Sequence, residues 1–296
     1  MANLFINLSA VQNKMLKISI IIPTYNRMNF LRDAVVSVLN QSYGNFEIII
    51  VDDCSQDGTT SVVESIKDER IIYIKHSENR GVAASCNTGI NKSTGNFVFI
   101  LNDDDLITQD ALGKLVDKII HSGVENLGGV YGWSWWVDGR GNTLRVIDSQ
   151  ERGNILEKII KKQNFTNLLV KREVFNVIGL YEESLRNNED FDFYLRMAKK
   201  YQFDFVPEII TVVRGHNQSH LSSFSKVNIN LHDKVIEKFH GKPVNAKRLL
   251  FEIVPSGLYV RLSKLKNYIL YFIKRKKFSK RIEEIRENFK AQGINI

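Results

Sequence analysis

The sequence has little cysteine and no long hydrophobic run. Its only cysteines are Cys54 and Cys86, too few for a disulfide framework or a cysteine-ligated metal cluster. We therefore expect a protein of a reducing compartment, the cytoplasm. No apolar run reaches about 18 residues, and the first residues lack a basic segment followed by an apolar core. The sequence thus predicts neither a transmembrane helix nor a secretory signal.

Acidic residues do not dominate either, because the formal net charge is +8. The positive charge is concentrated in residues 257–281, which contain nine Lys or Arg residues and no Asp or Glu. The nearly neutral remainder argues against nucleic acid as a partner. Aliphatic and aromatic residues among these cations are typical of helices on anionic membrane surfaces, here the inner face of the plasma membrane. The alternative is a packed helix pair with a solvated basic face.

The first 120 residues alternate between strand and helix patterns. Buried strands are predicted at residues 17–22, 46–51, 71–75 and 97–101, where apolar, often β-branched residues follow one another. Helices are predicted over 30–39, after Asp57-Gly58, over 81–92, and from a cap at Thr108 to Ile120. This alternation predicts an α/β fold with a mostly parallel central sheet flanked by helices.

The second half is less regular. Strands are expected over 129–137, with a hairpin turn at 138–141, over 166–171, and over 203–214 with a break at Pro207. Helices are expected over 188–201 and 225–240, and two basic helices from about Lys247 onward.

Polar residues follow three of the predicted strands at the point where each strand ends. These clusters are Thr24 to Arg27, Asp52-Asp53, and Asn102 to Asp105. Ligands of parallel α/β sheets bind beyond the carboxyl ends of the strands. The sequence therefore predicts one ligand site at this edge.

Asn102 to Asp105 suits a divalent cation, because Mg²⁺ commonly uses one or two carboxylates together with substrate phosphates. The alternative is a solvated turn that caps the next helix. Asp53 could accept a hydrogen bond from a nucleotide base, or could serve turn chemistry with Ser55 and Gly58.

Further candidates lie in the second half. Glu189 or Asp190 could act as a general base, although acids in a first helical turn also suit the helix dipole. Arg214 and His216 could contact a diphosphate or a metal ion, or could be structural. Trp133 belongs to alternating aromatic residues that could stack on a sugar, although we expect most of them in the core. Trp133 and Arg214 are also the candidates for acceptor contact.

These motifs, in this order, resemble the inverting family-2 glycosyltransferases of the GT-A fold. The matching strings include ISIIIPTYNR, VDDCSQDGT, ENRGVAASCNTGI, FVFILNDDD, NNEDFDFYLRM and VVRGHNQSHLS. The resemblance covers residues 16–222, which we expect to form the catalytic domain. Residues 1–15 would then be an N-terminal extension, and residues 223–296 a helical C-terminal region.

The resemblance implies a role for each matching residue. The residues around the nucleotide would be Pro23, Thr24, Tyr25 and Arg27, with Asp53 at the base, usually uracil, and Asp103 at the ribose. Asp104 would ligate Mn²⁺ or Mg²⁺, with His216 at the metal and diphosphate. Asp190 would be the catalytic base, with Glu189 beside it.

The chain departs from the family pattern at two positions. Cys86 stands where the family often has an arginine, and Asn102 replaces the first acid of the metal motif. The Gln-x-x-Arg-Trp motif of processive synthases is absent, which favours transfer of a single sugar. We expect a UDP-sugar donor and a glycan or lipid-linked acceptor. The alternatives are a nucleotidyltransferase, for which a Gly-rich basic loop after the first strand is missing, and a non-catalytic nucleotide-sugar-binding protein.

Overall fold

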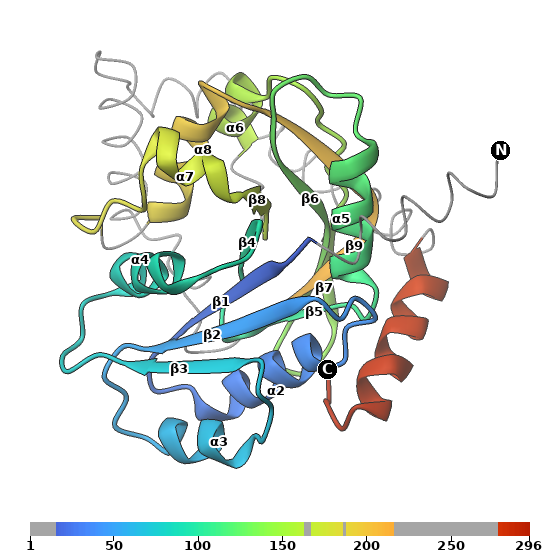
Figure 1. The fold of residues 1–296 in the computed structure, drawn as a ribbon. Helices are drawn as coiled ribbons and strands as arrows, with labels where there is room; N and C mark the ends of the chain where they lie inside the picture. The colour runs from blue at the N-terminus through green and yellow to red at the C-terminus, as the bar shows by residue number, and fades with distance from the viewer. Residues whose placement is uncertain (1–15, 163–166, 186–187, 216–277) are drawn as a thin grey trace, which may run out of the picture.

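A computed structural model describes residues 16–162, 167–185, 188–215 and 278–296 (Figure 1). Its centre is a nine-stranded sheet in the order β3-β2-β1-β4-β8-β6-β9-β5, with β7 paired to β6. The first four strands are β1 Ile18–Thr24, β2 Phe46–Asp52, β3 Ile71–Lys75 and β4 Phe97–Ile100. All pairings among these four are parallel.

Helices cover both faces of the parallel strands, as their apolar patterns require. The crossover helices are α2 Met28–Leu39, α3 Thr59–Ser65 and α4 Val82–Lys92. Figure 1 shows α2 and α3 on one face and α4 on the other. Alternate residues of β1 accordingly join different cores, with Ile20 packed beside α2 and Ile21 beside α4. This parallel half confirms the predicted α/β class.

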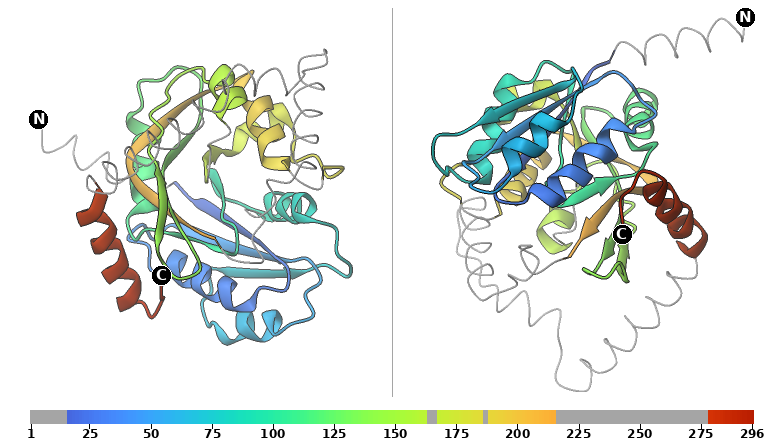
Figure 2. Two further views of the ribbon diagram at one scale, coloured as in Figure 1. Left: turned by 180° about the vertical axis from the view of Figure 1, so that it is seen from behind. Right: turned by 90° about the horizontal axis from the view of Figure 1, so that it is seen from below.

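The second half completes the sheet with mixed pairings. Its strands are β5 Asp105–Ile107, β6 Leu127–Val137, β7 Thr143–Ile147, β8 Leu169–Lys171 and β9 Gln202–Arg214. β6 and β9 are parallel, whereas β8 is antiparallel to β4 and β6, β5 to β9, and β7 to β6. The helices are α5 Ala111–His121, α6 Leu156–Lys162, α7 Arg172–Ile178 and α8 Glu189–Ala198. Figure 2 shows the long strand β9 curving along its length.

Two local predictions were wrong. β9 runs through Pro207 without a break, because Pro207 is exposed and lies where the β6–β9 register shifts. A proline is tolerated at such an irregularity, since no ladder hydrogen bond needs its missing N–H. α5 begins at Ala111 after Asp110, so Thr108 is not its cap. The Thr108 hydroxyl instead donates to the Ile209 carbonyl at 3.1 Å.

A helix over residues 278–291, here called the C-terminal helix, packs on the β5, β6 and β9 part of the sheet (Figure 1, red). Phe278, Ile282, Ile285 and Phe289 are buried at helical spacing. Phe278 meets the Trp133 ring edge-on, with centroids 5.3 Å apart. The helices predicted between residues 225 and 277 lie outside the described residues. Among the described helices, none has the length and apolar character needed to cross a bilayer.

Candidate functional site

The carboxyl ends of β1, β2 and β4 form a hydrogen-bonded rim, as the strand-end pattern predicted. The register sets Thr24 beside Asp52. The Asp53 N–H donates to the Thr24 carbonyl at 2.9 Å. The Thr24 hydroxyl donates to Asp103 Oδ2 at 2.7 Å. Three loops that are distant in sequence therefore meet at one edge of the sheet.

Arg27 holds the acids of this rim together. Its Nη1 donates to Asp103 Oδ1 and to Asp104 Oδ2, at 3.0 Å in each case. The preceding Asn26 has a positive φ of 53°, and its backbone N–H donates to Ser55 Oγ at 2.8 Å. A left-handed asparagine lets the chain turn sharply here, so the loop after β1 is fixed against the loop after β2.

The rim is short of positive charge. Burial and the neighbouring Asp104 raise the pKa of Asp103 to about 6. Burial also raises the pKa of Asp105, again with a contribution from Asp104. Among the described residues, the guanidinium groups of Arg27 and Arg214 therefore do not fully offset the three acids, and a further cation would be stabilised beside them.

The donor set fits Mg²⁺ or Mn²⁺ bound together with a diphosphate. The described residues contain no group of three or more His, Cys, Asp or Glu side chains arranged around a metal position. Mg²⁺ commonly takes one or two protein carboxylates and completes its shell with phosphate oxygens and water. Asp104, which is 8% exposed, can supply such a carboxylate. His216 lies outside the described residues.

Arg214 links the acidic loop to β9 and α2 through hydrogen bonds. Its Nε donates to the Asp104 carbonyl at 2.7 Å, and its Nη1 to Asp33 Oδ2 at 2.7 Å. Its Nη2 reaches the Phe30 carbonyl at 3.2 Å. These contacts tie β9 and α2 to the acids, so they favour a structural position for Arg214 over contact with an acceptor.

Asp53 anchors the start of α4. Its Oδ1 accepts from the Arg80 N–H at 2.8 Å, and its Oδ2 from the Gly81 N–H at 2.7 Å. His76 Nδ1 lies 2.9 Å from Oδ1, and its Nε2 lies 3.0 Å from the Thr88 hydroxyl. A carboxylate can accept about four hydrogen bonds, so Oδ2 has capacity for a ligand N–H.

Sequence analysis missed His76. The signal was present, because His76 directly follows β3 and the ends of parallel strands share one edge. A buried histidine beside a site carboxylate fixes the orientation of that carboxylate.

Glu189 and Asp190 form the first turn of α8, after a left-handed Asn188 with φ 61°. Burial and the charge of Asp190 raise the pKa of Glu189 to about 7. The surrounding protein also raises the pKa of Asp190, although its side chain is exposed to solvent. Both charges raise the pKa of the buried Cys86 thiol in α4, after the larger effect of burial. The acid pair therefore lies beside α4, and the two residues just before α4, Arg80 and Gly81, bind Asp53.

The remaining candidates differ in their surroundings. Tyr25 is 46% exposed at the rim, whereas Pro23 is buried within β1. Trp133 is buried against Phe278, and its Nε1 donates to the Ser149 carbonyl at 3.1 Å. Trp133 thus belongs to the core under the C-terminal helix, as expected for most of these aromatic residues.

Comparisons with known proteins agree with this geometry. Residues 19–179 match the family model Glycosyl transferase family 2. A Haemophilus influenzae protein described as an uncharacterized glycosyltransferase is 27% identical, covering 86% of this chain and 97% of its own length. Glycosyltransferase GlyA of Streptococcus pneumoniae is 41% identical over 106 residues, which are 35% of this chain and 15% of that protein.

Two solved structures share the fold. Residues 1–349 of Staphylococcus aureus TarS, in complex with UDP-GlcNAc, superpose with a TM-score of 0.64 at 20% identity, covering 79% of this chain and 69% of that one. The mannosyltransferase PcManGT from Pyrobaculum calidifontis, in complex with GDP-Man and Mn²⁺, gives 0.51 at 16% identity and covers 90% and 84%.

The sheet with its flanking helices, and its likeness to these structures, define a GT-A fold. The family model covers more than half of the chain, and the protein belongs to glycosyltransferase family 2. This membership favours glycosyl transfer over the nucleotidyl transfer and non-catalytic binding considered from the sequence.

Proposed function

We propose that the protein transfers one sugar from a UDP-sugar to a hydroxyl of a glycan or lipid-linked acceptor, with inversion at the anomeric carbon. The observation that carries the proposal is the connected rim of Asp53, Thr24, Asp103, Arg27 and Asp104. The TarS complexes with UDP-GlcNAc and UDP support a uridine donor. Such a transferase suits the synthesis of cell-surface polysaccharide or glycoconjugate.

In this proposal, each rim residue binds a different part of the donor. Asp53 Oδ2 accepts an N–H of the base, since Oδ1 already accepts two hydrogen bonds. Tyr25 offers an exposed ring beside the base. Asp103 faces the ribose, and Asp104 holds Mn²⁺ or Mg²⁺. The metal ion, when bound, offsets charge on the leaving diphosphate.

Asp190 is the proposed general base. The acceptor oxygen attacks the anomeric carbon, the bond from that carbon to the diphosphate breaks, and the acceptor proton passes to Asp190. Glu189 strengthens Asp190 as a base, because a second negative charge nearby favours proton uptake. Placement in the first turn of α8 gives the carboxylate a fixed backbone.

Replacement of Asp190 by Asn tests this role. We expect transfer to fall by roughly 10²–10⁴-fold, the usual contribution of a general base, while UDP affinity stays within about twofold. Released UDP measures transfer, and titration calorimetry measures binding. Asp117→Asn, at an exposed carboxylate of α5, is the matched control. Full turnover in Asp190→Asn would show that Asp190 is not the general base.

The proposal includes attachment to an anionic membrane surface through residues 257–281. Nine cations occur there without an acid, and each is worth about 1 kcal/mol near an anionic leaflet. Residues 257–277 lie outside the described part of the chain, so the support comes from sequence. Replacing Lys274, Arg275, Lys276 and Lys277 by Gln should abolish salt-sensitive co-sedimentation with phosphatidylserine vesicles. Equal sedimentation of the wild-type protein and this variant would contradict membrane attachment through residues 257–281.

A further inference from the structure

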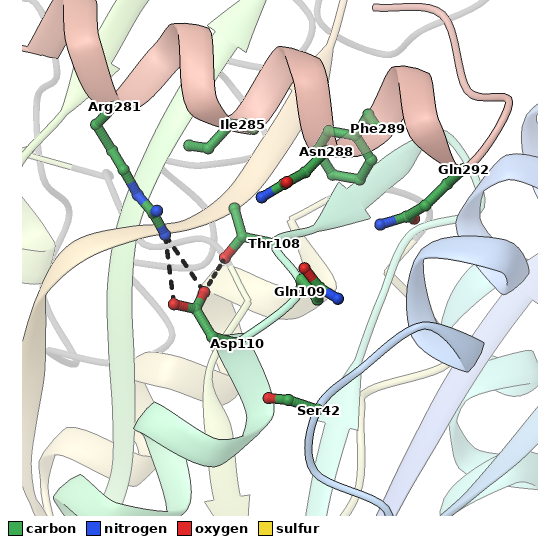
Figure 3. Close-up of a pocket in the computed structure, with 9 residues that line it drawn as sticks. All are labelled: Ser42, Thr108, Gln109, Asp110, Arg281, Ile285, Asn288, Phe289 and Gln292. Carbon is green, nitrogen blue, oxygen red and sulfur yellow. Dashed lines mark hydrogen bonds and ion pairs between the residues drawn. The ribbon is translucent and has the colours of Figure 1, made fainter.

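A pocket of about 160 Å³ lies between the C-terminal helix and the start of α5 (Figure 3). The helix contributes Arg281, Asn288 and Phe289, and Gln292 directly follows it. The segment before α5 contributes Gln109 and Asp110. The pocket is smaller than the roughly 300–1,000 Å³ that drug-sized ligands occupy. Its size therefore suits one small ring.

Charges in the pocket are paired with one another. Arg281 Nη2 reaches both oxygens of Asp110, at 3.3 and 3.4 Å. Asp110 also pairs with Lys114, and Arg281 Nη1 with Glu284. Because these charges are already satisfied, the pocket favours a neutral guest over a phosphate or a metal cation.

Two buried polar atoms of the pocket residues have no hydrogen-bond partner among the residues that the structure describes. They are Arg281 Nε, a donor, and Gln292 Oε1, an acceptor. Leaving a buried polar group unpaired costs about 1–3 kcal/mol. A hydroxyl both donates and accepts, so it can pair with either kind of atom.

The rest of the lining matches the same chemistry. Gln109 and Asn288 add amide groups to the pocket lining, as Figure 3 shows, and Phe289 and Ile285 supply apolar surface. A sugar ring presents hydroxyls at its edge and C–H groups on its faces. We propose that this pocket binds a single uncharged sugar unit, either free or within a glycan.

The pocket is separate from the transfer site. β5 begins at Asp105 on the acidic rim, and the pocket residue Thr108 comes three residues later. This is about 10 Å along a strand. Ser42, another lining residue, precedes the start of β2, whereas Asp52 and Asp53 lie at its other end. A sugar bound here leaves the donor site accessible.

Saturation-transfer NMR on the full chain tests the proposal, with UDP and the diamagnetic ion Mg²⁺ present in excess to fill the donor site. The probes are the methyl glycosides of glucose, galactose, mannose and N-acetylglucosamine, together with their disaccharides. We expect at least one probe to give a signal. The signal should fall at least fivefold in Gln292→Leu and in Asn288→Leu. It should persist in Gln150→Leu, an exposed glutamine elsewhere on the chain.

Asn288 is exposed on the C-terminal helix, so its variant should fold even if Gln292→Leu does not. Signals from methyl glycosides identify binding of the free unit, and signals from disaccharides alone identify binding within a glycan. The proposal is overturned if no probe binds at 10 mM of each sugar, roughly the weak limit for a single ring. It is also overturned if Asn288→Leu leaves binding unchanged, or if a sugar signal appears only when UDP is left out.

Discussion

His76 is a buried residue that connects Asp53 to the interior of α4. One ring nitrogen lies 2.9 Å from Asp53 Oδ1, and the other lies 3.0 Å from the Thr88 hydroxyl. An ionised carboxylate only accepts, so Nδ1 donates to Asp53 Oδ1. This arrangement holds the Asp53 carboxylate in one orientation.

Replacing His76 by Ala should lower UDP affinity by roughly 10- to 150-fold, because one lost orienting hydrogen bond to a charged group is worth roughly 1.5–3 kcal/mol. His76→Asn should retain part of the affinity, since its amide can still donate. Titration calorimetry measures both. His121→Ala, on the exposed side of α5, is the control. Unchanged UDP affinity in His76→Ala would show that the histidine is only structural.

The pair Glu189 and Asp190 should set the pH dependence of transfer. Burial and the charge of Asp190 raise the pKa of Glu189 to about 7, and desolvation by the surrounding protein raises that of Asp190. Protons leave such a pair in steps that belong to both groups. Below about pH 7 the pair binds an extra proton, so kcat/KM should rise as the pH increases through this value.

Glu189→Gln separates the two carboxyl groups. Removing the neighbouring negative charge lowers the pKa of Asp190, so the acid limb of the kcat/KM profile should move to lower pH. The maximal rate should also fall, because the remaining carboxylate is a weaker base. Initial rates between pH 5 and pH 9 provide the measurement. A limb that does not move would mean that another group controls the profile.

At the scale of elements, the C-terminal helix behaves as part of the sheet's core. Phe289 is 1% exposed and packs with Leu106, Trp135 and Val212 from three strands. Figure 2 shows the helix, in red, against this side of the sheet. We therefore expect the helix to be required for the stability of the catalytic domain.

Phe289→Ala should reduce the free energy of unfolding by about 3–5 kcal/mol, the usual loss for a buried phenylalanine. Urea denaturation followed by tryptophan fluorescence measures it, since Trp133 and Trp135 lie in the same cluster. Lys290→Ala changes an exposed neighbour and should shift stability by less than about 0.5 kcal/mol. Similar midpoints for wild type and Phe289→Ala would show that the helix packs only weakly.

The parallel half of the fold could be predicted from sequence because each of its strands is a continuous apolar run. β3 was predicted with its observed ends, and β2 to within one residue. β5 was missed, because it has only three residues and begins with Asp105. Its pairing with β9 depends on residues about a hundred positions away, which no local pattern contains.

The same distinction applies to the site. The rim was predictable because strand ends of a parallel sheet share one edge. The contacts of Arg214 with Asp104 and Asp33 could not be predicted. Arg214 is separated from Asp104 by 110 positions in the sequence and from Asp33 by 181. The pairing of Arg27 with two acids also depends on a left-handed Asn26, a conformation that sequence indicates only weakly.

At the scale of the whole molecule, donor binding should couple to stability, because the rim joins three loops. A ligand at about 100 times its Kd stabilises the folded state by about 2.7 kcal/mol. For a domain of this size the melting temperature should rise by roughly 5–10 °C. UDP with Mn²⁺ should give this shift, GDP a smaller one, and Asp53→Ala should abolish it. A larger shift with GDP would show that the donor carries guanine rather than uracil.

The packing of the C-terminal helix also has a consequence for biosynthesis. Trp133, Trp135 and Val212 need Phe289 to complete their cluster, yet Phe289 is translated long after β9. Between Arg214 and Phe289 a ribosome adding 5–20 residues per second needs roughly 4–15 s. During that interval the C-terminal helix cannot yet cover this aromatic cluster, so newly made chains should depend on chaperones until residue 289 has emerged.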